Sequence, residues 1–143
     1  MTAQMLAERL GGPAVLRSEV RSDLDIAELI HQGLPLRVVD VVLASGLLRA
    51  DELYTLVVPR RTLAHRREKQ HALSPEQSDR LARVVRVMAR AEEALGSPDR
   101  ATHWMRKENR ALAGKRPIDL LESDAGTRMV ERVLGRIEHG VYS

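Results

Sequence analysis

Apolar residues recur every three or four positions along most of the chain, which is the spacing of one face of an α-helix. No segment alternates apolar and polar residues in the manner of a half-buried strand. The pattern therefore predicts an all-α protein, a helical bundle. Two apolar stripes are clearest: Leu81, Val84, Val85, Met88 and Leu95 in the first, and Val130, Val133, Leu134 and Ile137 in the second.

Capping residues mark the expected helix boundaries. The run SPEQ at 74–77 places an N-cap serine, a first-turn proline and a capping-box glutamine in the order that starts a helix. Ser22, Ser97 and Ser123 are further N-cap residues. Together these signals predict seven or eight helices, and they leave residues 1–21 with one short helix.

The amino-acid composition favours helices and a reducing environment. Phe is absent and there is one Trp, so the core must be built mainly from aliphatic residues and Met, most of which are good helix formers. The absence of Cys excludes disulfides and thiolate metal sites and favours the cytoplasm. We find no signal peptide and no run near the ~20 apolar residues of a membrane span, so no membrane partner is expected. Trp104 lies among aliphatic residues and is expected in the core.

The formal net charge of +3 is concentrated in one part of the chain. Residues 59–90 hold nine basic and three acidic side chains, whereas residues 1–58 hold five basic and eight acidic ones, and residues 91–143 hold nine of each. Clustering of this kind is typical of a protein that binds a polyanion such as DNA.

The segment PRRTLAHRREK, residues 59–69, is the most basic stretch. It follows a short predicted helix and a tight connection that carries Val57 and Val58 where glycine is common. This order is typical of a helix-turn-helix, whose second helix enters the major groove. Counted from Thr62, helical spacing gathers polar side chains on one face, and Leu63 on another side can anchor the helix. The alternative is a solvated basic face of a bundle helix. The candidate DNA-binding residues are Arg60, Arg61, Thr62, His65, Arg66 and Lys69.

A second row of basic residues lies in the long helix expected after Ser74. Its members could follow phosphates, or they could pair with acids of the N-terminal half or of a partner protein, and both interpretations stay open. The row consists of Arg80, Arg83, Arg86 and Arg90.

Several motifs together resemble the Xre/MbcA/ParS family of antitoxins. The likeness runs from about residue 34 to the C-terminus and includes the stretches RRTLAHRR, LSPEQSDRLARVV and ATHWMRKENRALAGKRP. Its most specific markers are Arg61-Thr62-Leu63, Ser78-Asp79-Arg80, Trp104, Asn109, Leu112-Ala113-Gly114, Pro117, Asp119-Leu120-Leu121 and Gly140-Val141.

The resemblance implies an N-terminal Xre-like helix-turn-helix region and a C-terminal helical toxin-binding domain. On this basis we divide the chain into a partly helical N-terminal segment (1–33), a helix-turn-helix DNA-binding region (34–73) and a helical dimerisation and toxin-binding domain (74–143). Such antitoxins pair with RES-domain toxins, which degrade NAD or use it for ADP-ribosylation. They commonly form homodimers, occlude the active site of the toxin and repress their own operon by binding operator DNA.

The C-terminal tail is the candidate toxin-binding segment. Gly140 can end the last helix and turn the chain outward, and an aromatic residue and a terminal carboxylate follow it. The residues alone leave open a frayed terminus or a segment that enters a nucleotide pocket, and the resemblance favours the pocket. The candidate residues are Arg136, His139, Gly140, Val141, Tyr142 and Ser143.

The sequence contains no recognisable catalytic constellation. Its five histidines are scattered without a metal-ligand spacing, and no glycine-rich phosphate loop follows a strand. We therefore expect no enzyme, no cofactor, no catalytic residue and no metal site. Besides the antitoxin, two interpretations stay open. One is a stand-alone helix-turn-helix transcription regulator without a toxin partner, and the other is a protein inhibitor whose helix-turn-helix no longer binds DNA.

Overall fold

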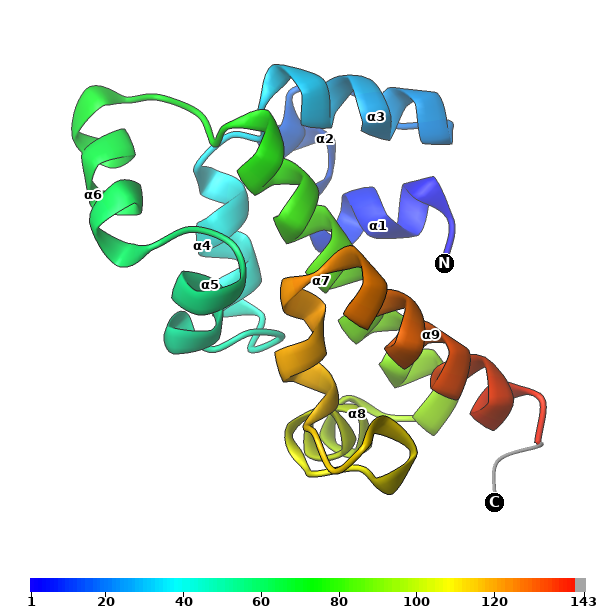
Figure 1. Cartoon of the computed structure of the whole chain (residues 1–143). Coiled ribbons are helices and arrows are strands. Elements are labelled where there is room, and N and C mark those ends of the chain that lie inside the picture. The colour runs from blue at the N-terminus through cyan, green and yellow to red at the C-terminus, as the bar shows by residue number, and fades with distance from the viewer. Residues whose placement is uncertain (141–143) are drawn as a thin grey trace. The chain divides into compact units, whose positions relative to one another are not determined.

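The computed structural model describes residues 1–140 and builds them from α-helices and short 3₁₀-helices (Figure 1). Within these residues there is no β-strand, and an isolated bridge between Asn109 and Lys115 joins the two ends of a loop. The all-α prediction is confirmed. The elements are α1 (Ala3–Arg9), α2 (Gly12–Leu16), α3 (Asp23–Gln32), α4 (Arg37–Ala44), α5 (Ala50–Leu56), α6 (Arg60–Lys69), α7 (Pro75–Leu95), α8 (Pro98–Arg106), η1 (Arg110–Leu112), η2 (Pro117–Glu122) and α9 (Asp124–Glu138).

The chain forms two compact units, Met1–Val85 and Arg86–Ser143, and the boundary between them lies inside α7. The first unit contains α1 to α6 and the first half of α7. The second contains the rest of α7, then α8, η1, η2 and α9.

The capping box predicted at Ser74 is present, and Ser22, which was predicted as an N-cap residue, forms a capping box as well. Ser22 Oγ accepts a hydrogen bond from the backbone N–H of Asp25 at 3.3 Å, and the Asp25 carboxylate accepts one from the N–H of Ser22 at 3.1 Å. At the start of α7, Ser74 Oγ accepts from the N–H of Gln77 at 3.1 Å, and Gln77 Oε1 accepts from the N–H of Ser74 at 2.9 Å. These bonds satisfy amide groups that a helix start leaves without partners, and α7 begins at Pro75, as the sequence predicted.

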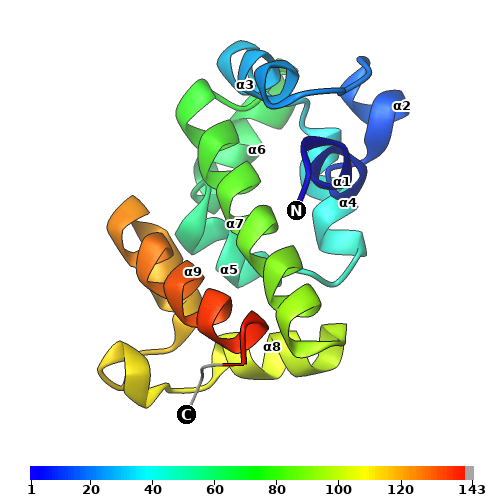
Figure 2. The same cartoon turned by 90° about the vertical axis from the view of Figure 1, so that its right-hand side faces the viewer.

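Residues 1–21 contain two helices where the sequence predicted one. Gly11 and Gly12 have φ angles of 119° and 72°, which glycine adopts readily, and they reverse the chain between α1 and α2. Leu10 and Leu16 are buried at this reversal. A helix of five residues is too short to give a periodic signal, so the second helix was missed. Helix α1 lies beside α2 and α3 (Figures 1 and 2).

A buried hydroxyl of α7 and a backbone hydrogen bond fix the loop between α3 and α4. The side chain of Ser78, in α7, is 0% exposed, and its Oγ accepts a hydrogen bond from the N–H of Leu34 at 2.8 Å. The carbonyl oxygen of Leu34 in turn accepts from the N–H of Leu73 at 3.0 Å. The loop between α3 and α4 is thereby fixed against the loop that leads from α6 to α7.

In the second unit, α9 packs against η2 and lies along the second half of α7 (Figure 1). Ion pairs reinforce this packing. Arg90 of α7 contacts Glu131 at 3.4 Å and Glu138 at 3.0 Å, and Arg86 contacts Glu131 at 3.5 Å. Each half of α9 is therefore tied to α7 by a carboxylate.

We predict that Ser78→Ala lowers the free energy of unfolding by about 1–3 kcal/mol, because the buried N–H of Leu34 loses its acceptor. Ser18→Ala is the matched control. Ser18 is exposed, and its hydroxyl reaches the carbonyl oxygen of Glu19 only at 3.5 Å, so a change within about 0.5 kcal/mol is expected. Urea unfolding followed by circular dichroism measures both variants. Equal stabilities would contradict the structural role of Ser78.

Replacing each of two glycines of α9 by alanine is predicted to change the free energy of unfolding in opposite directions. A Cβ atom at Gly126 would collide with the carbonyl oxygen of Leu120, whereas one at Gly135 would meet Nη2 of Arg90 at an ordinary 3.5 Å. Gly126→Ala is therefore expected to lower the free energy of unfolding by about 1–3 kcal/mol. Gly135→Ala should raise it by up to about 1 kcal/mol, because alanine favours the helix. Thermal denaturation compares the two, and a shift in the same direction for both would contradict the prediction.

Candidate nucleic-acid interface and partner-binding region

Three residues, Val57, Val58 and Pro59, connect α5 to α6 without a glycine. None of them has a positive φ: Val57 closes α5 at φ −117°, and Pro59 precedes α6 at φ −57°. The side chain of Val58 is 0% exposed, and Arg80 Nη1 of α7 donates to the carbonyl oxygen of Val57 at 3.4 Å. Because no left-handed residue is required, valines can stand where glycine is common in this motif.

The exposed face of α6 carries the basic side chains. Leu63 is buried, and it fixes which side of the helix faces the core. Arg61, His65 and Lys69 are exposed and follow one another at intervals of four, so they form a single row along the helix, called here the α6 ridge. Arg60 is exposed at the first residue of the helix. This geometry gathers four of the predicted DNA-binding residues on accessible surface.

The other two predicted residues, Thr62 and Arg66, are half-buried. Arg66 lies three positions after Leu63 and therefore shares its side of the helix. Its Nη1 donates to the carbonyl oxygen of Ala72 at 2.7 Å, and its Nε is buried without a partner in the described residues. Arg66 thus holds the loop that follows α6. The sequence analysis counted the exposed face of the helix from Thr62. Because Leu63 is buried, the exposed face is instead the one that carries the α6 ridge.

The arginines of the second row, in α7, are engaged in contacts within α7 or with neighbouring elements. Arg80 bonds to the connection before α6, as described above, and Arg83 pairs with Asp79 at 3.6 Å. Arg86 and Arg90 pair with carboxylates of α9. Neither interpretation is observed as it was stated: Arg83, Arg86 and Arg90 pair with acids, but these acids belong to α7 and α9 and not to the N-terminal half, and Arg80 bonds to a backbone carbonyl oxygen.

Trp104 is half-buried, so its expected place in the core is wrong. Ala101 and Met105, both 0% exposed, occupy the buried side of α8 and leave the tryptophan at the edge. Trp104 lines a cavity of about 560 Å³ together with Lys107 and Arg110. An apolar ring beside two cations forms an accessible surface of mixed character in the second unit.

The loop after α8 is organised by Asn109. Its Oδ1 accepts from the N–H of Ala111 at 2.9 Å, its N–H donates to the carbonyl oxygen of Lys115 at 3.1 Å, and its carbonyl oxygen accepts from the N–H of Gly114 at 2.9 Å. Asn109 is buried, and it closes the loop on both sides.

Three of the six predicted toxin-binding residues lie among the residues that the structure describes. Arg136 and His139 are exposed, three positions apart on the last turn of α9 and its C-cap. Gly140 follows with φ +70°, as predicted for a residue that ends this helix. Val141, Tyr142 and Ser143 lie outside the described residues.

Two further properties concern residues 1–140. No group of three or more His, Cys, Asp or Glu side chains in this range is arranged to hold a metal ion. Nor does any helix in this range combine the length and the apolar character that crossing a membrane requires.

Comparison with known families matches both parts of the chain. A sequence profile described as the antitoxin Xre-like helix-turn-helix domain matches residues 25–86. A second profile, described as the antitoxin Xre/MbcA/ParS C-terminal toxin-binding domain, matches residues 90–140.

Individual relatives agree with these matches. A protein named Antitoxin Xre from Yersinia enterocolitica is 34% identical over 120 residues, which cover 82% of this chain and 81% of the relative. Antitoxin Xre from Pseudomonas putida is 32% identical over 146 residues, covering 95% and 92%. A Prs ADP-ribosylating antitoxin from Sphingobium sp. is 29% identical over 80 residues, half of each chain. The chain therefore belongs to the Xre/MbcA/ParS family of antitoxins, with an Xre-like helix-turn-helix domain followed by a C-terminal toxin-binding domain.

Proposed function

We propose that this antitoxin has two activities, carried by different parts of the chain. Its helix α6 binds operator DNA of its own operon, and its C-terminal region occludes the active site of a NAD-consuming RES-domain toxin. The observation that carries the DNA-binding half is the α6 ridge, a row of exposed basic side chains on a helix that Leu63 anchors from the opposite side. The match to a toxin-binding domain over residues 90–140 supports the other half and favours an antitoxin over a stand-alone regulator.

For DNA binding, α6 would lie in the major groove as the second helix of the motif. The guanidinium of Arg61 can donate two hydrogen bonds to a guanine edge, and His65 lies one turn further along. Arg60 and Lys69 stand at the two ends of the helix and would contact phosphates. As a homodimer, the protein would present two such helices to two half-sites about one turn of DNA apart.

For toxin binding, the C-terminal residues would compete with the nucleotide substrate for the same space. Arg136 and His139 would contact the rim of the toxin's pocket, and Gly140, Val141, Tyr142 and Ser143 would enter it. Exclusion of substrate in this way requires no catalytic group in the antitoxin, and the affinity comes from an apolar anchor and a charged rim. The name of the Sphingobium relative associates ADP-ribosylation with a protein similar to half of this chain, in line with a partner that acts on NAD.

We expect replacing Arg61 and Lys69 together by alanine to weaken binding to the promoter region of the operon about a hundredfold. Each lost charge-assisted contact costs about tenfold. Glu68→Gln, on the same exposed side, should strengthen binding, because it removes a negative charge next to the phosphates. Fluorescence anisotropy at several salt concentrations measures both effects. Unchanged affinity of the double variant would instead support an inhibitor that does not bind DNA.

Deletion of residues 140–143 is expected to abolish most of the protection against the toxin while leaving DNA binding and dimer mass unchanged. The reason is that the deleted segment enters only the toxin. Growth of cells that co-express the toxin encoded next to this gene measures protection, and co-purification measures the complex. Full protection by the shortened protein would refute the role of the tail.

A further inference from the structure

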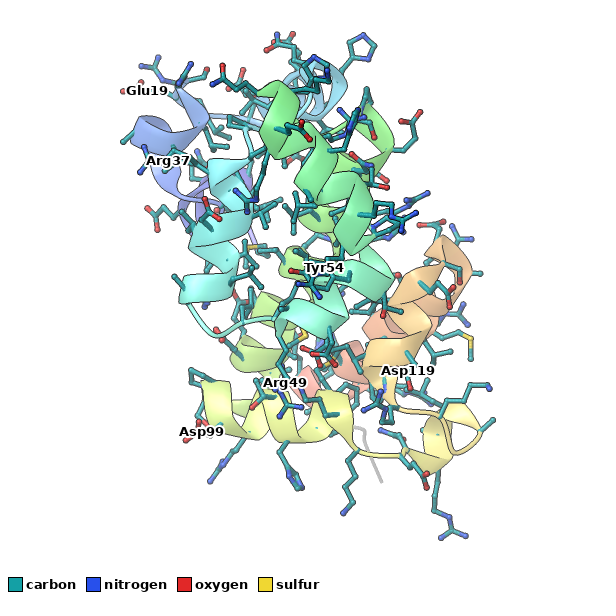
Figure 3. All side chains as sticks on the ribbon, turned by 90° about the vertical axis from the view of Figure 1, so that its left-hand side faces the viewer. Glu19, Arg37, Arg49, Tyr54, Asp99 and Asp119 are labelled. Carbon is teal, nitrogen blue, oxygen red and sulfur yellow. The ribbon has the colours of Figure 1, made fainter. Side chains whose placement is uncertain are left out.

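A cavity of about 480 Å³ opens in the first unit between α2, the start of α4 and the end of α6. Three arginines line it: Arg17 directly after α2, Arg37 at the first residue of α4, and Arg67 in the last turn of α6. Gln70 and His71, in the loop after α6, add polar groups to the lining. Figure 3 shows Arg37 at the end of α4 that lies beside α2. Residues far apart in the sequence thus bring three cations to one place.

The charge of this cavity is only partly neutralised. Arg67 Nη2 forms an ion pair with Asp40 at 2.8 Å. Within residues 1–140, the side chains of Arg17 and Arg37 have no hydrogen bond or ion pair. The wall also contains the buried apolar side chain of Val15, and a neighbouring apolar wall strengthens the attraction of the cations for an anion.

Acids on the neighbouring helix leave Arg17 available. Asp25 and Glu28 of α3 line an adjacent cavity that also includes Arg17. The carboxylate of Asp25 accepts hydrogen bonds from the backbone N–H groups of Arg21 and Ser22, at 2.8 and 3.1 Å, and so caps its own helix. Neither acid forms an ion pair with Arg17 among the described residues.

We propose that this cavity, called here the arginine pocket, binds a phosphate group. Guanidinium groups match phosphate oxygens with pairs of parallel hydrogen bonds, and they remain charged at every physiological pH. The phosphate can belong to the DNA backbone or to a free phosphate ester. The backbone is the expected source, because α6 supplies Arg67 and because phosphates flank a helix in the major groove; this choice of source rests on the proposed operator binding. Arg17 precedes residues 25–86, so the pocket would extend the interface beyond the matched helix-turn-helix.

The first arm of the test measures DNA binding by the full-length protein. Arg37→Gln removes one cation, and Arg17→Asn removes another with a residue that tolerates the φ of 59° at this position. Arg132→Gln, on the exposed surface of α9, is the control with the same loss of charge. Each pocket variant is expected to weaken binding about tenfold. A phosphate contact carries no sequence information, so the loss should be equal for the promoter duplex and for a random duplex of the same length.

Salt dependence and a conservative variant sharpen this arm. The slope of log affinity against log salt should fall by about 1 for each pocket variant, and it should stay unchanged for Arg132→Gln. Arg37→Lys should recover part of the lost affinity, because it keeps the charge but not the paired hydrogen bonds.

The second arm uses inorganic pyrophosphate without DNA. Nuclear magnetic resonance of the arginine Nε–H groups is expected to show saturable shifts in the unmodified protein and in Arg132→Gln, and to lose them in Arg37→Gln and Arg17→Asn. Circular dichroism verifies that each variant is folded, and Arg37→Gln decides the matter if Arg17→Asn does not fold.

The two arms separate the possible outcomes. A loss of DNA affinity at the pocket variants identifies the backbone as the source. In a second outcome, the protein binds neither duplex, but pyrophosphate causes shifts that depend on Arg17 and Arg37. This result identifies a free phosphate ester as the source. It contradicts operator binding and supports the pocket. If the DNA affinities of the pocket variants equal that of Arg132→Gln, and no pyrophosphate shift depends on either arginine, the arginine pocket is refuted.

Discussion

The burial of Leu63 sets the orientation of α6, and the proposed DNA interface depends on that orientation. Leu63 is the one side chain of this ten-residue helix that is buried. A helix with so little apolar surface cannot be held by packing alone. Its position is completed by polar contacts at its two ends: Arg80 bonds to the connection that precedes it, and Arg66 bonds to the loop that follows it. Two of the arginines therefore support the helix, so that others can remain exposed.

Most of the fold could be predicted because its helix boundaries are set by capping residues close to them in the sequence. Ser74 and Gln77 form the capping box that their spacing implies, and the resulting helix begins at the predicted residue. Ser97 and Ser123 likewise accept hydrogen bonds from the first turns of α8 and α9. Signals of this kind involve residues three positions apart, and so they can be recognised in the sequence without knowledge of the tertiary structure.

The parts that could not be predicted depend on contacts between distant segments. The arrangement of Arg17 beside Arg67 follows from how α2 packs, and no spacing in the sequence contains it. Arg66 was assigned to an exposed face because its carbonyl partner, Ala72, is reached only once the following loop is folded. Trp104 was assigned to the core on composition, whereas smaller neighbours fill the buried side of its helix.

The connection between α5 and α6 has one more consequence. Val58 is packed into the core, and no residue of the connection relies on the conformational freedom of glycine. The angle between the two helices is therefore fixed, and the connection does not act as a hinge. The angle between α5 and α6 cannot adjust to the curvature of a particular duplex unless Val58 leaves its packed position. Adaptation to different base sequences is then left to the long, flexible side chains at the surface.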